Sequence, residues 1–402
     1  MKEIYYFSSS LSPLNDYWIL KELLANNIEV KVINIYDLIN DSSKDIAVKN
    51  AQVEYYRVCR SSNELESVLA SIVKGNIAFA PTGGGVSQEI RYKLAEKGVS
   101  VVCDTTFSLP IVPLSTDMSN NAHYSNPIQK VLRVFQTKGA VGFIRHCVDF
   151  IKSRLPVRIS VKINKRRTIN LNKIRENTYL VTSGAKNHLA YRLISDAYNQ
   201  IKIGHFSTVC RESKLRRVVD GSYWVFIDQA LPFHRDSKRV GINYEHFADD
   251  YYHSLVSYFN YIEESTNKKV VVALHPRTEE TYAEYFTGYD TFKGLTEELI
   301  EYSEGIISHF STCIYSAVYL KKPVIIVTNR LMDMHHDVRR MHDFSQRLKI
   351  PIIDIDKQYP LDFESHIDVD KVAYQRFTEN YIKQSDAKDD TAVNILREKF
   401  GF

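Results

Sequence analysis

Two segments of the C-terminal half carry side chains that could hold and release a phosphate group. A buried-type strand, VVVAL, ends at the imidazole of His275, and a second run, EGIISHFST, passes from a strand into a helix through small hydroxyl side chains. Helix-start N–H groups, hydroxyls and an imidazole are all short donors to phosphate oxygens. Ligands of parallel α/β sheets bind beyond the carboxyl ends of the strands, where both segments fall. The candidate phosphate-binding residues are His275, Pro276, Arg277, Ser308, Ser311 and Thr312.

Each of these signals has a simpler explanation when it is taken alone. A serine or threonine before a helix is commonly just an N-cap. The occurrence of both segments at successive strand ends is what favours a phosphate site, where His275 would stabilise charge developing on a departing phosphate.

The elements that must position these side chains alternate along the whole chain. EIYYF, VKVINIY, NIAFA and VSVVC are strand-like, and helical patterns separate them; after a basic stretch the alternation restarts with NTYLVTSG, SYWVFIDQAL and KKVVVALHP. Such alternation predicts an α/β protein with mostly parallel sheets covered by helices on both faces. We expect two Rossmann-like domains, residues 1–172 and 173–365, followed by two amphipathic helical patterns in residues 366–402.

Length and composition narrow the function classes. A chain of 402 residues exceeds what one core usually organises, and 44% hydrophobic with 25% charged residues indicates folding throughout. Fifty-two basic minus 48 acidic residues leave a net charge of +4, too small to indicate nucleic acid. Five scattered cysteines without a CxxC pair favour reduced thiols in a cytoplasm. We expect neither a secretory signal nor a spanning helix.

One segment has the pattern of a membrane-surface helix. No acidic residue occurs between Phe150 and Arg175, and the preceding GAVGFIRHCVDFIKSRLP mixes apolar and basic residues. Such a helix binds anionic lipid at the interface. A solvated basic connector beside a core-facing helix gives the same pattern. Peripheral association with the inner face of the cytoplasmic membrane is therefore one of two open interpretations.

The chain resembles the bacterial sialyltransferases of GT-B fold and their polysialyltransferase and keto-deoxy-octulosonate transferase relatives. That family has a strand ending in His-Pro, a later Ser-Ser or Ser-Thr pair, and an upstream acidic loop. The corresponding stretches here are LHP at 274–276, ST at 311–312 and FIDQALPFHRD at 226–236, within residues 223–328. The resemblance implies a GT-B fold, in which two Rossmann-like domains face a cleft and C-terminal helices cross back to the first domain.

The resemblance also implies roles for the residues in these stretches. His275 would contact the phosphate of a CMP-sugar, and Ser311 and Thr312 would bind the same nucleotide. GT-B enzymes usually work without a metal ion, so we expect no cofactor other than the activated donor.

The catalytic base has three candidates, because the family's two acidic residues followed by glycine read Phe-His-Arg-Asp here. Asp236 is the first candidate, followed by His234 and Asp228. A carboxylate or imidazole can deprotonate an acceptor hydroxyl, and in a retaining relative a carboxylate would act as nucleophile. Asp228 has an alternative role, since an aspartate at a strand end often just fixes the following loop.

Three loops after other strands add candidates. The triple glycine in APTGGGVSQEI lets a ligand approach the backbone closely, although it matches neither GxGxxG nor a P-loop. Simple connection is an equally open explanation for each loop. The candidates are Ser9, Ser10, Gly83, Gly84 and Gly85 on the acceptor or donor-sugar side, and Ser183 and Gly184 on the nucleotide side.

A metal site finds little support in the sequence. The cluster MDMHHDVRRMHD matches no zinc motif, and DID at 354–356 is better explained as acidic residues at a strand end. We therefore expect a metal-independent enzyme.

The leading functional hypothesis is transfer of a sialic-acid-like nonulosonic acid from a CMP-activated donor to a hydroxyl of a bacterial surface glycan or glycolipid: capsule, lipopolysaccharide or lipooligosaccharide. A CDP-glycerol-type polymer transferase is the main alternative, because its phosphate site resembles this one. A non-catalytic GT-B glycan-assembly protein and a sugar epimerase of GT-B type also remain open. Nucleic acid is not an expected partner.

Overall fold

The computed structural model describes the parts of the chain that form two sheets and their helices. The described residues are 2–10, 17–39, 54–83, 85–106, 170–186, 199–205, 208, 215–234, 237, 242–276, 280–335, 338–357, 359, 363 and 367–402. The amphipathic segment 139–156 and most of the basic stretch lie outside them. Within the described ranges, no helix is both long and apolar enough to cross a membrane.

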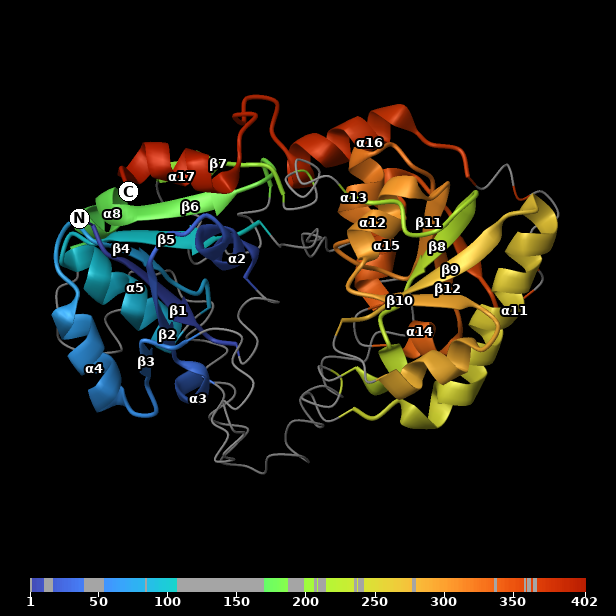
Figure 1. The fold of residues 1–402 in the computed structure, drawn as a ribbon, viewed down its shortest axis with the longest axis horizontal. Helices are drawn as coiled ribbons and strands as arrows, with labels where there is room; N and C mark the ends of the chain where they lie inside the picture. Colours follow the sequence, from blue (N-terminus) through green and yellow to red (C-terminus); the bar gives the residue numbers. More distant parts are fainter. Residues whose placement is uncertain are drawn as a thin grey trace, which may run out of the picture. The chain divides into compact units, whose positions relative to one another are not determined.

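The first sheet has the expected alternation of strands and helices. Its strands are β1 (Ile4–Ser8), β2 (Val30–Asn34), β3 (Arg57–Val58), β4 (Ile77–Phe79), β5 (Ser100–Asp104), β6 (Thr178–Thr182) and β7 (Asn199–Lys202). The intervening helices are α2 (Trp18–Ala25), α3 (Tyr36–Ile39), α4 (Ser62–Ser71), α5 (Val86–Glu96) and α8 (Leu171–Asn177). In Figure 1, α2 lies on one face of this sheet, and α4 and α5 lie on the other.

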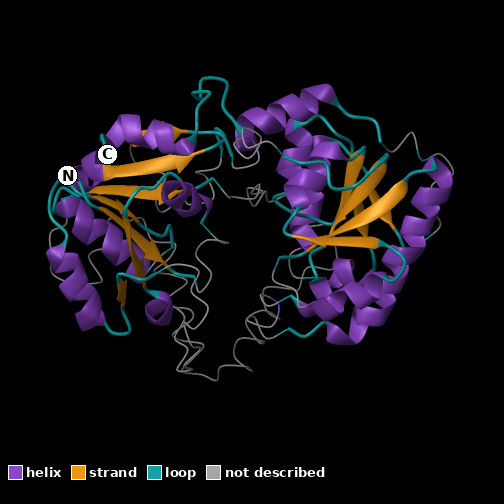
Figure 2. Ribbon diagram, in the orientation of Figure 1, coloured by secondary structure: helices purple, strands orange, loops and turns teal. Residues whose placement is uncertain are grey.

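The second sheet is built in the same way. Its strands are β8 (Tyr223–Ile227), β9 (Lys269–Leu274), β10 (Asp290–Lys293), β11 (Gly305–Ser308), β12 (Val324–Thr328) and β13 (Ile352–Asp354). The longer helices are α11 (Ala248–Thr266), α12 (Thr296–Tyr302), α13 (Ile314–Tyr319), α14 (Arg330–Met334) and α15 (Val338–Leu348). Helix α11 covers one face, whereas α12, α13 and α15 cover the other, so the strands lie between two helical layers (Figure 2).

Short helical turns and a C-terminal segment complete the described elements. The turns are η2 (Leu231–Phe233), η3 (Glu245–Phe247) and η4 (Glu280–Phe286). After β13 follow α16 (Lys371–Phe377), the π-helical turn η6 (Thr378–Ile382) and α17 (Ala392–Phe400). The expectation that residues 366–402 cross back to the first domain stays a prediction.

Both sheets have the same strand order. In the described residues the first sheet runs β3-β2-β1-β4-β5-β6-β7 and the second runs β10-β9-β8-β11-β12-β13. The pairs on either side of each reversal, β1 with β4 and β8 with β11, are parallel. In such doubly wound sheets the reversal in strand order opens a crevice at the carboxyl ends of the two strands that flank it. We call these places the first switch point, between β1 and β4, and the second switch point, between β8 and β11.

The first sheet extends beyond the expected domain boundary at residue 172. Strand β6, which the sequence assigned to the second half, pairs in the first sheet, and β7 follows it there. Two backbone hydrogen bonds fix its place: Thr105 donates to Val181 at 3.0 Å and Ile203 donates to Thr182 at 2.9 Å. A short apolar run indicates a strand without indicating its neighbours, so sequence periodicity could not reveal this pairing.

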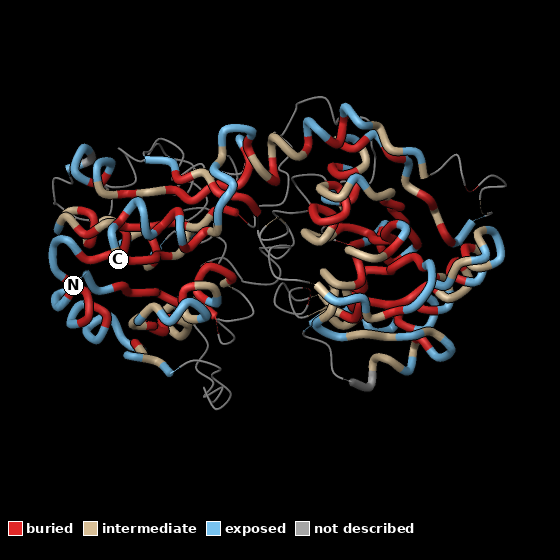
Figure 3. The backbone as a smooth tube through the Cα atoms, turned by 45° about the horizontal axis from the view of Figure 1, so that its top comes forward, coloured by how far each residue is buried: buried red, intermediate tan, exposed pale blue. Residues whose placement is uncertain are grey.

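The strands are the most buried part of each unit. The chain divides into two compact units, with residues 1–103, 112–180 and 191–199 in the first and 104–111, 181–190 and 200–402 in the second. Every residue of β1, β8 and β12 is buried, as expected for strands covered on both faces. In Figure 3 the buried stretches are red, and exposed residues lie on helix surfaces, in loops and on the edge strands β3, β7 and β10.

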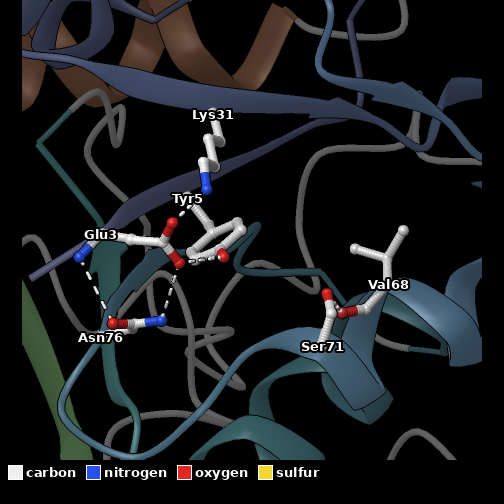
Figure 4. Close-up of polar contacts among 6 residues, drawn as sticks. All are labelled: Glu3, Tyr5, Lys31, Val68, Ser71 and Asn76. Atoms are coloured by element: carbon white, nitrogen blue, oxygen red, sulfur yellow. Dashed lines mark hydrogen bonds and ion pairs between the residues drawn. The ribbon is translucent and has the colours of Figure 1, made fainter.

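A polar cluster ties together the amino ends of the first sheet, opposite to its switch point. The Glu3 carboxylate accepts hydrogen bonds from the Tyr5 hydroxyl at 2.6 Å, from the Asn76 amide at 3.3 Å and from the Lys31 ammonium (Figure 4). The bond from Lys31 is the largest cause of the lowered pKa of Glu3. These contacts join β1, β2 and the start of β4, so the cluster is structural.

Candidate active site

The second switch point gathers the strand-end residues that the sequence singled out. Asp228 and Gln229 follow β8, and Ser308 is the last residue of β11. The Gln229 side-chain oxygen accepts the backbone N–H of Phe310 at 3.1 Å, which joins the two strand ends. His275 follows β9, the other neighbour of β8. The structure therefore brings the His-Pro segment and the Ser-Thr segment to one edge of one sheet.

Asp228 is a buried carboxylate that holds the strand ends. Its two oxygens accept backbone N–H groups, from Ala230 at 2.9 Å and from His275 at 3.4 Å, and only 3% of the residue is exposed. Burial raises its pKa from 3.8 to about 6, and these hydrogen bonds oppose the rise. Because its two oxygens accept backbone N–H groups from different loops, Asp228 positions the loops that follow β8 and β9. This geometry agrees with the loop-fixing alternative for Asp228.

The loop after β8 is held in an unfavourable conformation. Ala230 is left-handed, with φ 45° and ψ 43°, which costs a residue with a Cβ about 1 kcal/mol. The hydrogen bond to Asp228 and the turn η2, which starts at Leu231, hold it there. Strained backbone of this kind is concentrated at functional sites. No turn residue at position 230 indicates this conformation, because alanine rarely adopts it.

The strained turn places His234 beside His275. Their ring centroids are 5.3 Å apart with an interplanar angle of 72°, and both residues are half-buried. An imidazole can donate or accept a proton near neutral pH. Of two imidazoles in contact, one can take the proton of an attacking hydroxyl, and the other can donate a hydrogen bond to a leaving group.

The end of β11 supplies hydroxyl groups. Ser308 is fully buried, and in the described part of the chain its hydroxyl has no hydrogen-bond partner. The Ser311 hydroxyl accepts the backbone N–H of Cys313 at 3.2 Å, and Thr312 is half-buried. The following helix, α13, has only six residues. Ser311 thus has the local role expected of a residue at a helix start.

A buried histidine at this switch point was missed by the sequence analysis. The Tyr251 hydroxyl lies 2.9 Å from Nε2 of His309, and Nδ1 of His309 lies 2.7 Å from the Val327 carbonyl. A carbonyl can only accept, so Nδ1 carries the proton and Nε2 accepts from Tyr251. Burial lowers the pKa of His309 to about 4 and keeps the ring neutral. The only hint was its position within the SHFST segment.

The candidate loops of the first switch point are held by internal contacts. Ser9 contacts the Tyr17 hydroxyl through its backbone N–H at 3.1 Å and its own hydroxyl at 2.8 Å. The Ser8 hydroxyl contacts the Ser10 carbonyl at 3.1 Å. These hydroxyls shape the loop after β1.

The glycine loop after β4 is held by an arginine that the sequence analysis did not consider. Arg91 is 3% exposed, and its guanidinium donates to the carbonyls of Pro81 and Gly83, the latter at 2.9 Å. Gly85 has φ 58° and precedes the first residue of α5. A φ in this region favours glycine, so Gly85 has a structural reason to be there.

Ser183 and Gly184 lie where two chain segments cross. The Ser183 hydroxyl donates to the Tyr381 carbonyl at 3.0 Å. A Cβ on Gly184 would lie 2.2 Å from backbone atoms of Asn380 and Tyr381. Glycine is therefore required for close packing at this position, whatever its place in a nucleotide site.

The remaining candidates are more scattered. Pro276 is exposed next to His275, whereas Asp236, Arg277 and Gly84 lie outside the described residues. Asp333 accepts a hydrogen bond from Thr328 at 2.7 Å. Across the described ranges, no three His, Cys, Asp or Glu side chains are grouped so that they could hold a metal ion.

Comparison with solved structures identifies the fold. The wall teichoic acid polymerase TagF matches with a TM-score of 0.52 and 10% identity over 99% of this chain and 88% of that chain. A UDP-N-acetylglucosamine 2-epimerase has a TM-score of 0.43 at 10% identity, covering 99% and 96% of the two chains. The epimerase of Methanocaldococcus jannaschii has a TM-score of 0.38 at 11% identity, covering 94% and 98%.

No family model and no curated protein matches the sequence. At such low identity the likeness to solved structures concerns the fold alone. The predicted α/β fold of GT-B type, with two parallel sheets, is confirmed.

Proposed function

We propose that this chain is a glycosyltransferase that moves a sialic-acid-like nonulosonic acid from a CMP-activated donor to a hydroxyl of a surface glycan or glycolipid. The contact between His234 and His275 carries this proposal. The two imidazoles lie at the ends of β8 and β9, beside the second switch point, where sheets of this order bind ligands. The assignment of a cytidine nucleotide and of a nonulosonic acid depends on the family resemblance of the His-Pro and Ser-Thr segments.

The reaction needs one proton acceptor and one leaving-group donor. The acceptor oxygen forms a bond to the anomeric carbon while the bond from that carbon to the phosphate oxygen breaks. The electron pair of the broken bond leaves with CMP, and the hydroxyl proton passes to a base. We assign His234 as the base and His275 as the donor to the departing phosphate. Asp236, the first candidate from the sequence, lies outside the described residues and stays a candidate for the base.

Asp228 acts through its neighbours in this proposal. It accepts the backbone N–H of His275 and that of Ala230, the residue at the start of the turn that leads to His234. One buried carboxylate therefore fixes both loops that carry the imidazoles. We class Asp228 as a positioning residue.

The second candidate is a CDP-glycerol-type polymer transferase. The observation that favours it is the similarity in fold to a protein named as a wall teichoic acid polymerase. In that reaction the acceptor oxygen would attack phosphorus, and CMP would leave with the bond electrons. The same two imidazoles would serve, so donor preference is what separates the two candidates.

The test is thermal stabilisation by CMP, CDP, UMP, UDP, GDP and ADP, because a ligand that binds only the native state raises apparent stability. We expect CMP and CDP to raise the melting temperature and the other four to have little effect. Incubation with a CMP-nonulosonic acid or with CDP-glycerol, followed by mass spectrometry of the product, then identifies the transferred group. Stabilisation by UDP or GDP alone would refute the donor assignment.

A further inference from the structure

The second unit contains a pocket whose lining includes neither His234 nor His275. It has a volume of about 240 Å³ and lies between the start of α11 and the segments that follow β12 and β13. Helix α11 and strand β12 are labelled in Figure 1. Its lining residues are Phe247, Asp250, Tyr251, His253, Ser254, Asn329, Arg330, Leu331 and Asp356. The volume is below the usual range for drug-sized ligands, so the pocket suits a single ring.

A fixed carboxylate forms one wall of the pocket. Asp356 accepts the Ser254 hydroxyl at 2.5 Å on one oxygen and the backbone N–H of Arg330 at 2.7 Å on the other. A carboxylate has about four lone-pair sites, so each oxygen keeps acceptor capacity after these two bonds. Asp356 is therefore a positioned acceptor for a hydroxyl donor.

An aromatic face and a guanidinium form another part of the lining. The guanidinium of Arg330 lies over the Phe247 ring, 5.8 Å from its centroid. Stacking orders the guanidinium while its N–H groups remain able to donate in the ring plane. The pocket thus presents donors and acceptors beside apolar surface.

The charges of the lining select against anions. Asp250 and Asp356 carry two negative charges, whereas Arg330 supplies one positive charge. Phosphate and sialic-acid carboxylate groups would meet a net negative lining. A neutral molecule whose hydroxyls both donate and accept satisfies the lining without that penalty.

A buried amide beside the pocket has unused donor capacity. Asn329 is 1% exposed, and its side-chain oxygen accepts the backbone N–H of Met332 at 3.0 Å. Within the described part of the chain, nothing accepts a hydrogen bond from its Nδ2. A hydroxyl oxygen of an occupant would supply that acceptor.

We propose that this pocket binds one neutral sugar ring, with ring hydroxyls donating to Asp250 and Asp356 and accepting from Arg330, whose guanidinium is held over the Phe247 ring. The site goes beyond the proposed transfer reaction, because it requires neither a nucleotide nor the histidine pair. A glycan held here would be anchored through one of its sugar units, while a different sugar unit reacts.

Saturation-transfer NMR of the whole chain tests the site with methyl β-glucoside, methyl β-galactoside and N-acetylglucosamine in the absence of nucleotide. We expect magnetic saturation to pass from the protein to the protons of at least one of these three sugars. Asp250→Asn should weaken its affinity about fivefold, because a hydrogen bond to a charged acceptor is replaced by one to a neutral group. Phe247→Ala should reduce transfer to the ring protons.

Asp249→Asn is the matched control. Asp249 is the neighbouring exposed carboxylate in the first turn of α11, but it does not line the pocket. Its substitution changes the helix-start charge by the same amount and should leave sugar binding unchanged. Three outcomes would overturn the proposal. They are an equal loss of sugar affinity in the Asp250 and Asp249 variants, no saturation transfer to any of the three sugars, and binding of cytidine in this pocket in place of a sugar. Thermal stabilisation by nucleotides tests the transferase proposal independently, so either proposal can fail without the other.

Discussion

The two switch points have the same topology but different side chains. Each lies between the first and fourth strands of a doubly wound parallel sheet. At the first, the serine hydroxyls after β1 and the Arg91 guanidinium are engaged by loop groups. At the second, two half-buried imidazoles lie in contact after β8 and β9, and a fully buried serine ends β11.

This difference shows that strand order creates a place for a ligand but does not supply its chemistry. The first switch point uses its polar groups mainly to hold loops. The second uses one buried carboxylate, Asp228, to hold loops, and two half-buried imidazoles follow its strands. We therefore expect substitutions at the first to change stability and substitutions at the second to change turnover.

The largest expected effect is on turnover at the second switch point. His275→Gln should lower the rate of transfer at least about 100-fold, because it removes the donor to the leaving phosphate, with little change in melting temperature. The rate is measured with the donor that the product assay identifies. His342→Gln, an exposed histidine on α15, is the control and should retain activity. Near-normal turnover of His275→Gln would remove the imidazole from the reaction.

The next largest effect is on stability at the first switch point. Arg91→Met keeps the aliphatic stem but removes the donors to the carbonyls of Pro81 and Gly83. We expect unfolding to become about 2 kcal/mol easier, as measured by urea denaturation, since bonds from charged donors are worth more than neutral ones. Lys93→Met on the same helix, where the ion pairs are solvent-exposed, should cost less than about 1 kcal/mol.

The third effect is a pH dependence of stability from buried groups in the second unit. Burial lowers the pKa of His309 to about 4 and that of His205 to about 3, so between about pH 4 and 6 the unfolded chain binds a proton on each that the native chain does not. Asp228 acts in the opposite sense, because burial raises its pKa to about 6 from 3.8. The net difference is one proton.

The contribution of these three groups to the free energy of unfolding should therefore increase by about 1.4 kcal/mol for each unit of rising pH in that window. Urea denaturation at pH 4.5, 5.0, 5.5 and 6.0 measures the slope. Replacing His309 with glutamine removes one titrating group and should bring the slope close to zero. An unchanged slope in that variant would show that His309 is protonated alike in both states.

Much of the fold could be predicted because its signals are local. The apolar runs and the alternation of strands with helices predicted parallel α/β sheets. Local signals of this kind also begin helices: Ser61 and Glu64, three residues apart, form a capping box at the start of α4. His275, Ser308 and Ser311 were placed correctly at strand ends, because a strand end is visible as the change from apolar to polar residues. Their nucleotide contacts stay predictions.

Other features depend on segments far apart in the chain. The sequence could not show that β6 pairs in the first sheet, that His309 is buried against Tyr251, or that Asp356 lines a pocket with residues of α11. It also gave no sign that Gly184 packs against the backbone of Asn380 and Tyr381.

The sequence by itself thus determined which residues end which strands, since apolar periodicity and turn residues act over a few neighbours. Only the tertiary structure decided which strand ends are adjacent, because pairing is set by burial summed over the whole sheet. It also decided the contacts of Asp228. The carboxylate accepts the backbone N–H groups of Ala230 and of His275, a residue 47 positions later in the chain, and so joins two loops whose proximity no local pattern shows.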